Sequence, residues 1–191
     1  AEIDSISAAG GLISIAVGIS LSDNQIKNTV SAYISDSTVT ASNGNIDVTA
    51  ESKPEITTRT EFVAVSVGIG ASVGVALSET TIEVVTKAYL QSATLRALGI
   101  GNEVRVRAFS ESEASPVTKG FSGGAIGVSV LDATATIAGS TEVWVGGSSS
   151  VTATNLLLHA DDMNTARPES KATSVGLITI SSSTSETILT R

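Results

Sequence analysis

The stretch Phe62–Ser78, FVAVSVGIGASVGVALS, decides the fold that this sequence predicts. Its odd-numbered positions from Val63 to Leu77 carry aliphatic residues, and its even-numbered positions carry Ala, Ser and Gly. A period of two is typical of β-strands, because successive side chains of a strand point to opposite sides. We therefore expect strands whose odd-numbered aliphatic side chains point into a core. One straight strand of this length would be unusually long, so we expect the chain to bend at its glycines.

The pattern returns along the whole chain. The tripeptide Ala-Tyr-Ile at 32–34 returns as Ala-Tyr-Leu at 88–90 and as Val-Trp-Val at 143–145. Upstream of it, residues 17–22 align with residues 73–78. A fixed period of this kind is typical of repeat architectures. The sequence thus predicts one continuous segment with repeat units at 6–61, 62–116 and 117–171 and a partial unit at 172–191.

The repeat favours an all-β parallel solenoid over a sandwich or a barrel, because each solenoid coil places the same residue types over those of the coil before. Dividing each unit by three gives coils of about 19 residues and about ten coils in all, while two wide coils of about 28 residues per unit remain an alternative. Ten coils spaced by about 4.8 Å would form a rod some 50 Å long. Neither end of the pattern has a polar cap, so we expect further units or another copy to cover the ends.

The segment 37–50, STVTASNGNIDVTA, resembles the coil pattern of filamentous haemagglutinin-like adhesins. The Ala-Tyr-Ile lead-in at 32–34 is similar to the repeats of leukotoxin-type filamentous adhesins. The resemblance implies a right-handed parallel β-helix in the shaft of a very large bacterial protein that is secreted or exposed at the cell surface. It brings no catalytic residues with it.

The composition excludes several classes of partner. The chain of 191 residues has 11 Lys and Arg against 19 Asp and Glu, a net charge of −8, which argues against nucleic acids and anionic membrane surfaces. It has no Cys, which excludes disulfides and thiolate metal sites. The uncharged run at 62–78 is too short and too rich in Gly and Ser for a membrane-spanning helix. The partners that remain are other copies of the chain, joined end to end or laterally, and host-cell, matrix or carbohydrate surfaces.

One motif imitates a catalytic triad. Residues 70–74, GASVG, fit the GxSxG pattern of a nucleophile, and Asp132 and His159 follow Ser72 in the order found in α/β-hydrolases. That motif requires a strand, a sharp turn and then a helix, whereas an alternating β pattern follows here. The equivalent residues 14–18 of the first unit lack both the Ser and the first Gly. We therefore interpret the glycines as structural and expect no enzyme, no catalytic residue and no cofactor.

Two groups of acidic residues are the remaining candidates for chemistry. Asp161, Asp162 and Glu169 belong to a segment that we expect to be a loop, where carboxylates could gather around a calcium ion or remain solvated. Parallel β-helices also include polysaccharide lyases and glycosidases, which use paired carboxylates. The acids that such a carbohydrate-active site would recruit are Glu103, Glu111 and Glu113.

Thr-x-Thr pairs suggest a third function, ice binding by stacked Thr rows. The pairs lie at 38–40, 58–60, 134–136 and 152–154. In the second unit Arg96 occupies the row of Thr40, which places a bulky charge where an ice lattice needs a small side chain. Exposed strands favour Thr without any ligand. We therefore expect a non-catalytic structural or adhesive shaft, with carbohydrate cleavage and ice binding as the alternatives.

Overall fold

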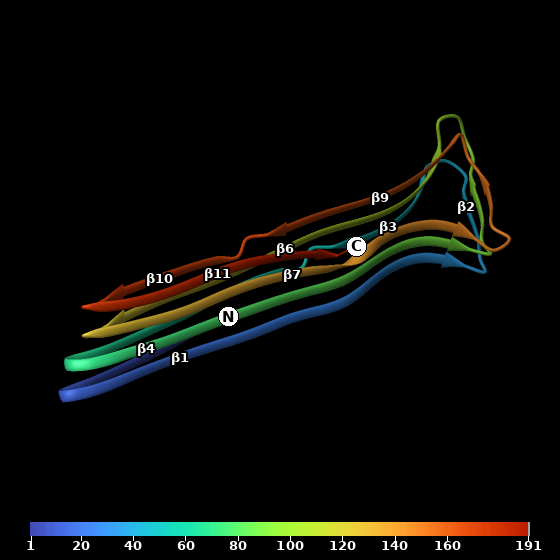
Figure 1. Cartoon of the computed structure of the whole chain (residues 1–191). Coiled ribbons are helices and arrows are strands. Elements are labelled where there is room, and N and C mark those ends of the chain that lie inside the picture. The colour runs from blue at the N-terminus through green and yellow to red at the C-terminus, as the bar shows by residue number, and fades with distance from the viewer. Residues whose placement is uncertain (191) are drawn as a thin grey trace.

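The computed structural model describes residues 1–190, and within this range the chain forms β-strands and turns but no helix (Figure 1). The strands range in length from 3 residues in β8 to 37 residues in β4. In chain order they are β1 (Glu2–Ser35), β2 (Thr38–Ala41), β3 (Ile46–Ser52), β4 (Glu55–Gln91), β5 (Thr94–Ala97), β6 (Glu103–Gly123), β7 (Ile126–Gly146), β8 (Ser150–Thr152), β9 (Asn155–Ala166), β10 (Glu169–Val175) and β11 (Ile178–Thr190).

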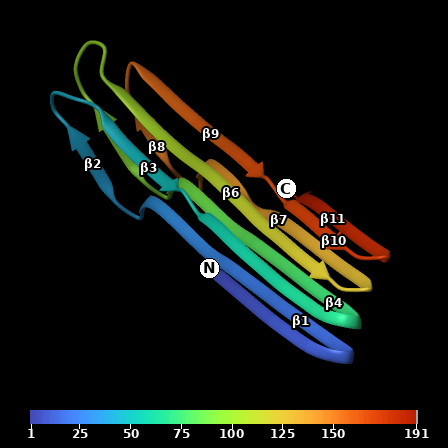
Figure 2. The same cartoon turned by 90° about the vertical axis from the view of Figure 1, so that its left-hand side faces the viewer.

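The longest strands, β1 and β4, each run to one end of the molecule, bend sharply and come back (Figure 1). We call this end the apex; β6 and β7, and β10 and β11, meet there through short turns. The arms that lead to the apex form the outgoing sheet: residues 2–10, β3, residues 55–67, β6, β9 and β10. The arms that lead away form the returning sheet: residues 13–35, residues 69–91, β7 and β11. At the opposite end β2, β5 and β8 form a short third sheet (Figure 2).

All strand pairs in residues 1–190 are parallel, and each joins residues one repeat apart. Ile46 pairs with Val104, 58 residues later, and Glu103 pairs with Asn155, 52 residues later. In coils of about 19 or 28 residues, paired residues would be only about 19 or 28 positions apart in the sequence. The predicted division of each unit into two or three coils is therefore wrong. One repeat is one passage around the molecule, and the described chain contains four strands of the returning sheet in place of about ten narrow coils.

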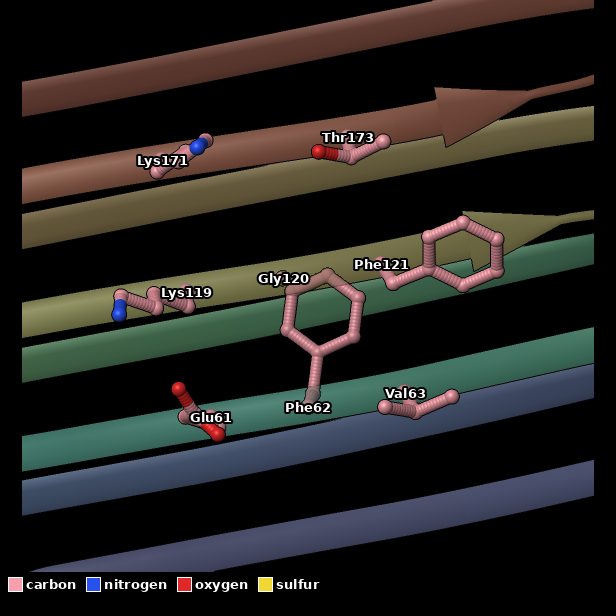
Figure 3. A pocket seen from close by; sticks show the side chains of 8 residues that line it. All are labelled: Glu61, Phe62, Val63, Lys119, Gly120, Phe121, Lys171 and Thr173. Carbon is pink, nitrogen blue, oxygen red and sulfur yellow. The ribbon is translucent and has the colours of Figure 1, made fainter.

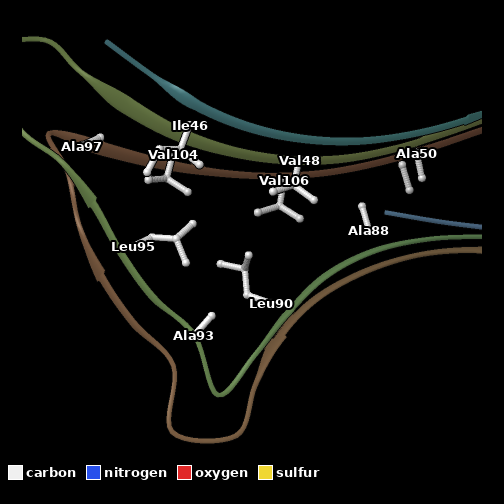
Figure 4. Close-up of a cluster of buried hydrophobic side chains, with 11 residues drawn as sticks. Ile46, Val48, Ala50, Ala88, Leu90, Ala93, Leu95, Ala97, Val104 and Val106 are labelled. Atoms are coloured by element: carbon white, nitrogen blue, oxygen red, sulfur yellow. The ribbon is translucent and has the colours of Figure 1, made fainter. Parts of the chain in front are cut away.

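The apolar core lies where the three sheets enclose a wide triangular space (Figure 4). Leu90 from the returning sheet, Leu95 from β5 and Val104 from the outgoing sheet are fully buried in it. Each such aliphatic side chain contributes roughly 1.5–3 kcal/mol by leaving water. A second cluster around Ile82 and Ile137 continues this core toward the apex.

Toward the apex the two long sheets converge, and the interior contains mainly Ser, Gly and Ala. Serine hydroxyls meet across the gap: the Oγ atoms of Ser14 and Ser66 are 2.6 Å apart, and those of Ser122 and Ser129 are 2.9 Å apart. Such contacts between short side chains require closely approaching backbones. Two large side chains, Phe62 and Leu131, are buried among them.

This convergence overturns the expected orientation of Val63 to Leu77. The even-numbered residues of this stretch face the interior, where Ala64, Ser72 and Ala76 are completely buried. The odd-numbered aliphatic residues face outward, and Ile69 is 76% exposed. The period of two was predicted correctly, but the inward assignment was wrong because the sheets lie close together here and their facing positions are filled mainly by Ala, Ser and Gly.

The turns repeat from passage to passage as well. At the apex Gly68 has a φ of 98°, and a Cβ at this position would overlap the carbonyl oxygen of Gly11 in the previous passage. Where the returning sheet ends, Asp36, Ser92 and Gly147 have φ values of 48°, 51° and 65°. Asp36 and Ser92 lie just after the aligned residues Ser35 and Gln91. Tight stacking of the passages thus requires the same backbone conformation at the same corner each time.

Candidate functional surface

The triad motif consists of Ser72, Asp132 and His159, which we expect to have no catalytic role. These three residues do not lie close together in the structure. Ser72 lies in the interior, completely buried, and its hydroxyl has no hydrogen-bond partner. Asp132 lies on the outer face of the returning sheet, and His159 is exposed on β9 in the outgoing sheet. A buried hydroxyl separated from both partners cannot act as the nucleophile of a triad, which requires hydrogen-bond reach between its members.

The acidic candidates for a metal site are in strands and not in a loop. Asp161 and Asp162 are consecutive residues of β9, so their side chains leave the strand on opposite sides, and Glu169 begins β10. Asp162 accepts a hydrogen bond from the amide of Asn164. Within residues 1–190 no group of three His, Asp or Glu side chains is placed to hold a metal ion.

The acids considered for carbohydrate cleavage all lie on the outer face of β6, and each has a basic partner. Glu103 contacts Arg105 at 2.7 Å, Glu111 contacts Lys53 at 4.0 Å and Glu113 contacts Arg167 at 3.4 Å. The hydrogen bond from Asn155, followed by that from Arg105, lowers the pKa of Glu103. A general acid requires the opposite, a raised pKa.

The Thr-x-Thr pairs lie on different faces. Thr38 and Thr40 belong to the short sheet, where Arg96 stacks on Thr40 as the sequence predicted. Thr58 and Thr60 point into the interior and are completely buried. The pair at 134–136 lies on the outer face of the returning sheet. A lattice-matching row needs the pairs at one register on one face, and the structure does not assemble them.

Both long sheets carry grooves on their outer faces. One groove of about 290 Å³ on the outgoing sheet lies between Glu61, Lys119 and Lys171 on one side and Val63 and Phe121 on the other (Figure 3). Another, of about 480 Å³, crosses the returning sheet beside Leu21, Leu77 and Asp132. Each is a channel between rows of side chains of stacked strands.

An aromatic ladder stands near the end of the returning sheet away from the apex. The ring of Tyr89 stacks on that of Tyr33 at a centroid distance of 5.1 Å and on that of Trp144 at 4.3 Å. The ammonium of Lys87 lies 5.9 Å from the centre of the Trp144 ring. These are the repeated residues that marked the period in the sequence. Because the rings cover one another's faces, the ladder stabilises the stacking of the passages and offers no free face between its rings.

The outer face of the returning sheet near the apex is an apolar field. This name denotes outward-facing aliphatic residues in register on four neighbouring strands. Its members are Ile13, Ile15, Val17, Ile19 and Leu21 of β1, Ile69, Ala71, Val73, Val75 and Leu77 of β4, Ile126, Val128 and Val130 of β7, and Ile178 and Ile180 of β11.

Sequence reasoning missed the apolar field because it placed these aliphatic residues in the core. A signal was present: the aliphatic residues of β4 are odd-numbered up to Leu77 but even-numbered at Ile82, Val84 and Leu90. In an unbroken strand the two sets must face opposite sides. One of them therefore had to be exposed.

A comparison with models of protein families, with curated proteins and with solved structures finds no match for this chain. Among residues 1–190 there is no helix with the length and apolar character needed to cross a membrane. The functional interpretation depends on the geometry alone.

Proposed function

We propose that this chain is a segment of a parallel β-solenoid with a structural, non-catalytic role in a larger secreted or surface-exposed repeat protein of the filamentous adhesin kind. The observation that carries the proposal is the register: equivalent residues of successive repeats lie directly beside one another, as in the series Tyr33, Tyr89 and Trp144. A fold of this kind grows by adding repeats along one axis.

The chemistry of the outer faces also supports a structural role. The acidic residues that could have served catalysis are engaged by Arg and Lys, and these exposed pairs mainly keep the surface polar. The outer faces of the long strands, such as the face of β6 with Glu103, Arg105 and Glu111, offer broad surfaces for contact with host cells, matrix or carbohydrate. In the adhesin interpretation, such faces would carry the contacts.

A structural segment also needs to be rigid. The positions of the Lys and Arg residues, after which trypsin cleaves, provide a test of this rigidity. Of the described Lys and Arg residues, only Lys53 and Arg167 lie outside strands. Each is followed by a proline, Pro54 or Pro168, and trypsin cleaves poorly before proline. Native trypsin digestion should therefore leave residues 1–190 intact, whereas rapid internal cleavage would contradict a rigid segment.

The decisive experiment screens neutral and acidic polysaccharides for both retention of the protein and release of reducing or unsaturated ends. The proposal predicts no turnover on any polysaccharide, with retention on those that the outer faces bind. The matched variants are Glu111→Gln and Glu113→Gln, which remove one carboxylate each from the outer face of β6. Turnover that either variant abolishes would refute the structural role and favour carbohydrate cleavage.

A further inference from the structure

Two lysines on the outer face of the outgoing sheet have no carboxylate partner. Lys119 of β6 and Lys171 of β10 are direct neighbours in register. Of the described Lys and Arg residues, only these two and Arg96 form no ion pair, although acidic residues outnumber basic ones by 19 to 11 in the chain. Like charges at adjacent positions of neighbouring strands repel each other. An anion placed between the two ammonium groups would remove this repulsion.

The two lysines belong to one wall of the groove of about 290 Å³ on the outgoing sheet (Figure 3). The opposite wall lies two residues nearer the apex and contains Phe121 and Thr173, and Phe121 is 36% exposed. Phe62 and Gly120 separate the walls and belong to the interior face, so the floor of the groove is backbone. The groove has about the volume of the smallest ligand pockets, which start near 300 Å³. It therefore suits one small ring beside a negative charge.

Acidic residues border the lysine pair on two sides. Glu61 precedes Lys119 in the same row, and Glu169 lies two residues before Lys171 on the same face of β10. Glu61 contacts Arg59 at 2.6 Å and forms no ion pair with Lys119. A long polyanion would meet these carboxylates and be repelled, whereas a ligand with one negative charge would meet only the ammonium groups. The Glu61 carboxylate can also accept hydrogen bonds from the hydroxyl groups of a ligand.

We propose that this groove binds a single acidic sugar residue, a pyranose that carries one carboxylate. The carboxylate lies between the ammonium groups of Lys119 and Lys171, which supply charge-assisted hydrogen bonds. The apolar face of the sugar ring covers Phe121, and a ring hydroxyl donates to Glu61. The proposal rests on the adhesive part of the function proposed above and deepens it, because it names the class of carbohydrate that the outer face holds.

Titration of the isotope-labelled chain with glucuronate, glucose and acetate, followed by nuclear magnetic resonance, tests the site. In an open groove of this kind we expect a dissociation constant for glucuronate on the order of 1 mM, with shift changes confined to β6, β10 and the adjoining part of β4. Glucose lacks the charge and acetate lacks the ring, so each should bind about tenfold more weakly or less. Equal binding of glucuronate and acetate, or of glucuronate and glucose, would overturn the proposal.

Three variants separate the parts of the site. Lys119→Gln and Lys171→Gln should each weaken glucuronate binding about tenfold and leave glucose binding unchanged, because each removes one ammonium group and keeps most of the side chain. Phe121→Ala should weaken the binding of both sugars and leave that of acetate unchanged. Far-ultraviolet circular dichroism of each variant should match that of the unaltered chain.

Lys87→Gln is the matched control. Lys87 also lies two residues before an aromatic residue of a long strand, Tyr89, but its ammonium is already paired with Glu142 at 3.6 Å. This variant should bind glucuronate as the unaltered chain does, and a Lys119→Gln chain that binds equally well would contradict the proposal. None of the three ligands contains a glycosidic bond to cleave. Absence of binding therefore overturns the acidic-sugar site alone, whereas turnover in the polysaccharide screen overturns the structural role alone.

Discussion

The side chain of Phe62 offers a quantitative test of how the narrow part of the molecule is packed. Phe62 is 1% exposed, and its ring occupies space beside two glycines: a Cβ at Gly74 or at Gly120 would overlap the ring. Gly74 belongs to the opposite sheet and Gly120 to the neighbouring strand. The ring is thus enclosed from both sides. Phe62→Ala should leave a cavity and cost about 3–5 kcal/mol.

The glycine at position 74 should behave differently with and without the ring. In the unaltered chain, Gly74→Ala forces the new methyl group against Phe62, and such overpacking costs about 1–3 kcal/mol. In the Phe62→Ala background the methyl group has room, and the lower entropy of the unfolded chain should stabilise the protein by about 0.4–1 kcal/mol. The effect of the same substitution therefore changes sign, with a coupling of about 1.5–4 kcal/mol.

Gly18 provides the control, because it pairs with Gly74 in register on the neighbouring strand. A Cβ at Gly18 would lie 3.5 Å from the Cβ of Phe62, an ordinary van der Waals contact. Gly18→Ala should therefore be neutral or slightly stabilising. Urea unfolding followed by circular dichroism gives all the free energies, and a loss of 3–5 kcal/mol corresponds to a midpoint shift of roughly 1–3 M. Equal effects of Gly74→Ala in both backgrounds would refute this account of the packing.

Three further outcomes follow from other contacts. Tyr89→Ala should remove two ring stacks and cost about 1–3 kcal/mol, with altered emission of Trp144; unchanged stability would mean that the ladder adds nothing. Because its pKa is lowered in the folded state, Glu103 stabilises the fold above its ordinary pKa of 4.5 and loses that contribution below it. Glu103→Gln should therefore flatten the acid limb of a stability profile, and an unaltered limb would contradict this. Gly68→Ala should destabilise by at least about 1–3 kcal/mol through its positive φ, whereas Gly10→Ala, which has open space, should be neutral in the same melt.

The sequence was sufficient to predict β-strands that stack repeat upon repeat, but not all of the strands or the way they assemble. The period of two and the return of the Tyr33 segment at Tyr89 indicated strands that stack in register, and both are confirmed. The length of one coil could not be derived, because the same repeat is compatible with one, two or three coils. The difference depends on where the chain turns, and interior glycines such as Gly74 resemble turn glycines such as Gly68 in the sequence.

The functional surface was harder to predict for a physical reason. The usual expectation that aliphatic side chains are buried holds at Leu90, where the sheets stand apart, and fails at Val73, where they converge. Only the distance between the sheets separates these cases, and it arises from residues distant in sequence, such as Ser14 and Ser66. The serine of the triad motif, Ser72, is an interior residue of the same kind.

One passage per repeat has a consequence for the reach of any protein built this way. The returning arm of β4, residues 69–91, spans about 75 Å, while the next passage adds only about 4.8 Å along the stacking direction. Each ångström of growth along the stacking direction therefore requires more than ten residues. A stack of such passages is therefore wide and flat rather than slender. Its resistance to bending differs greatly between its wide and its thin directions.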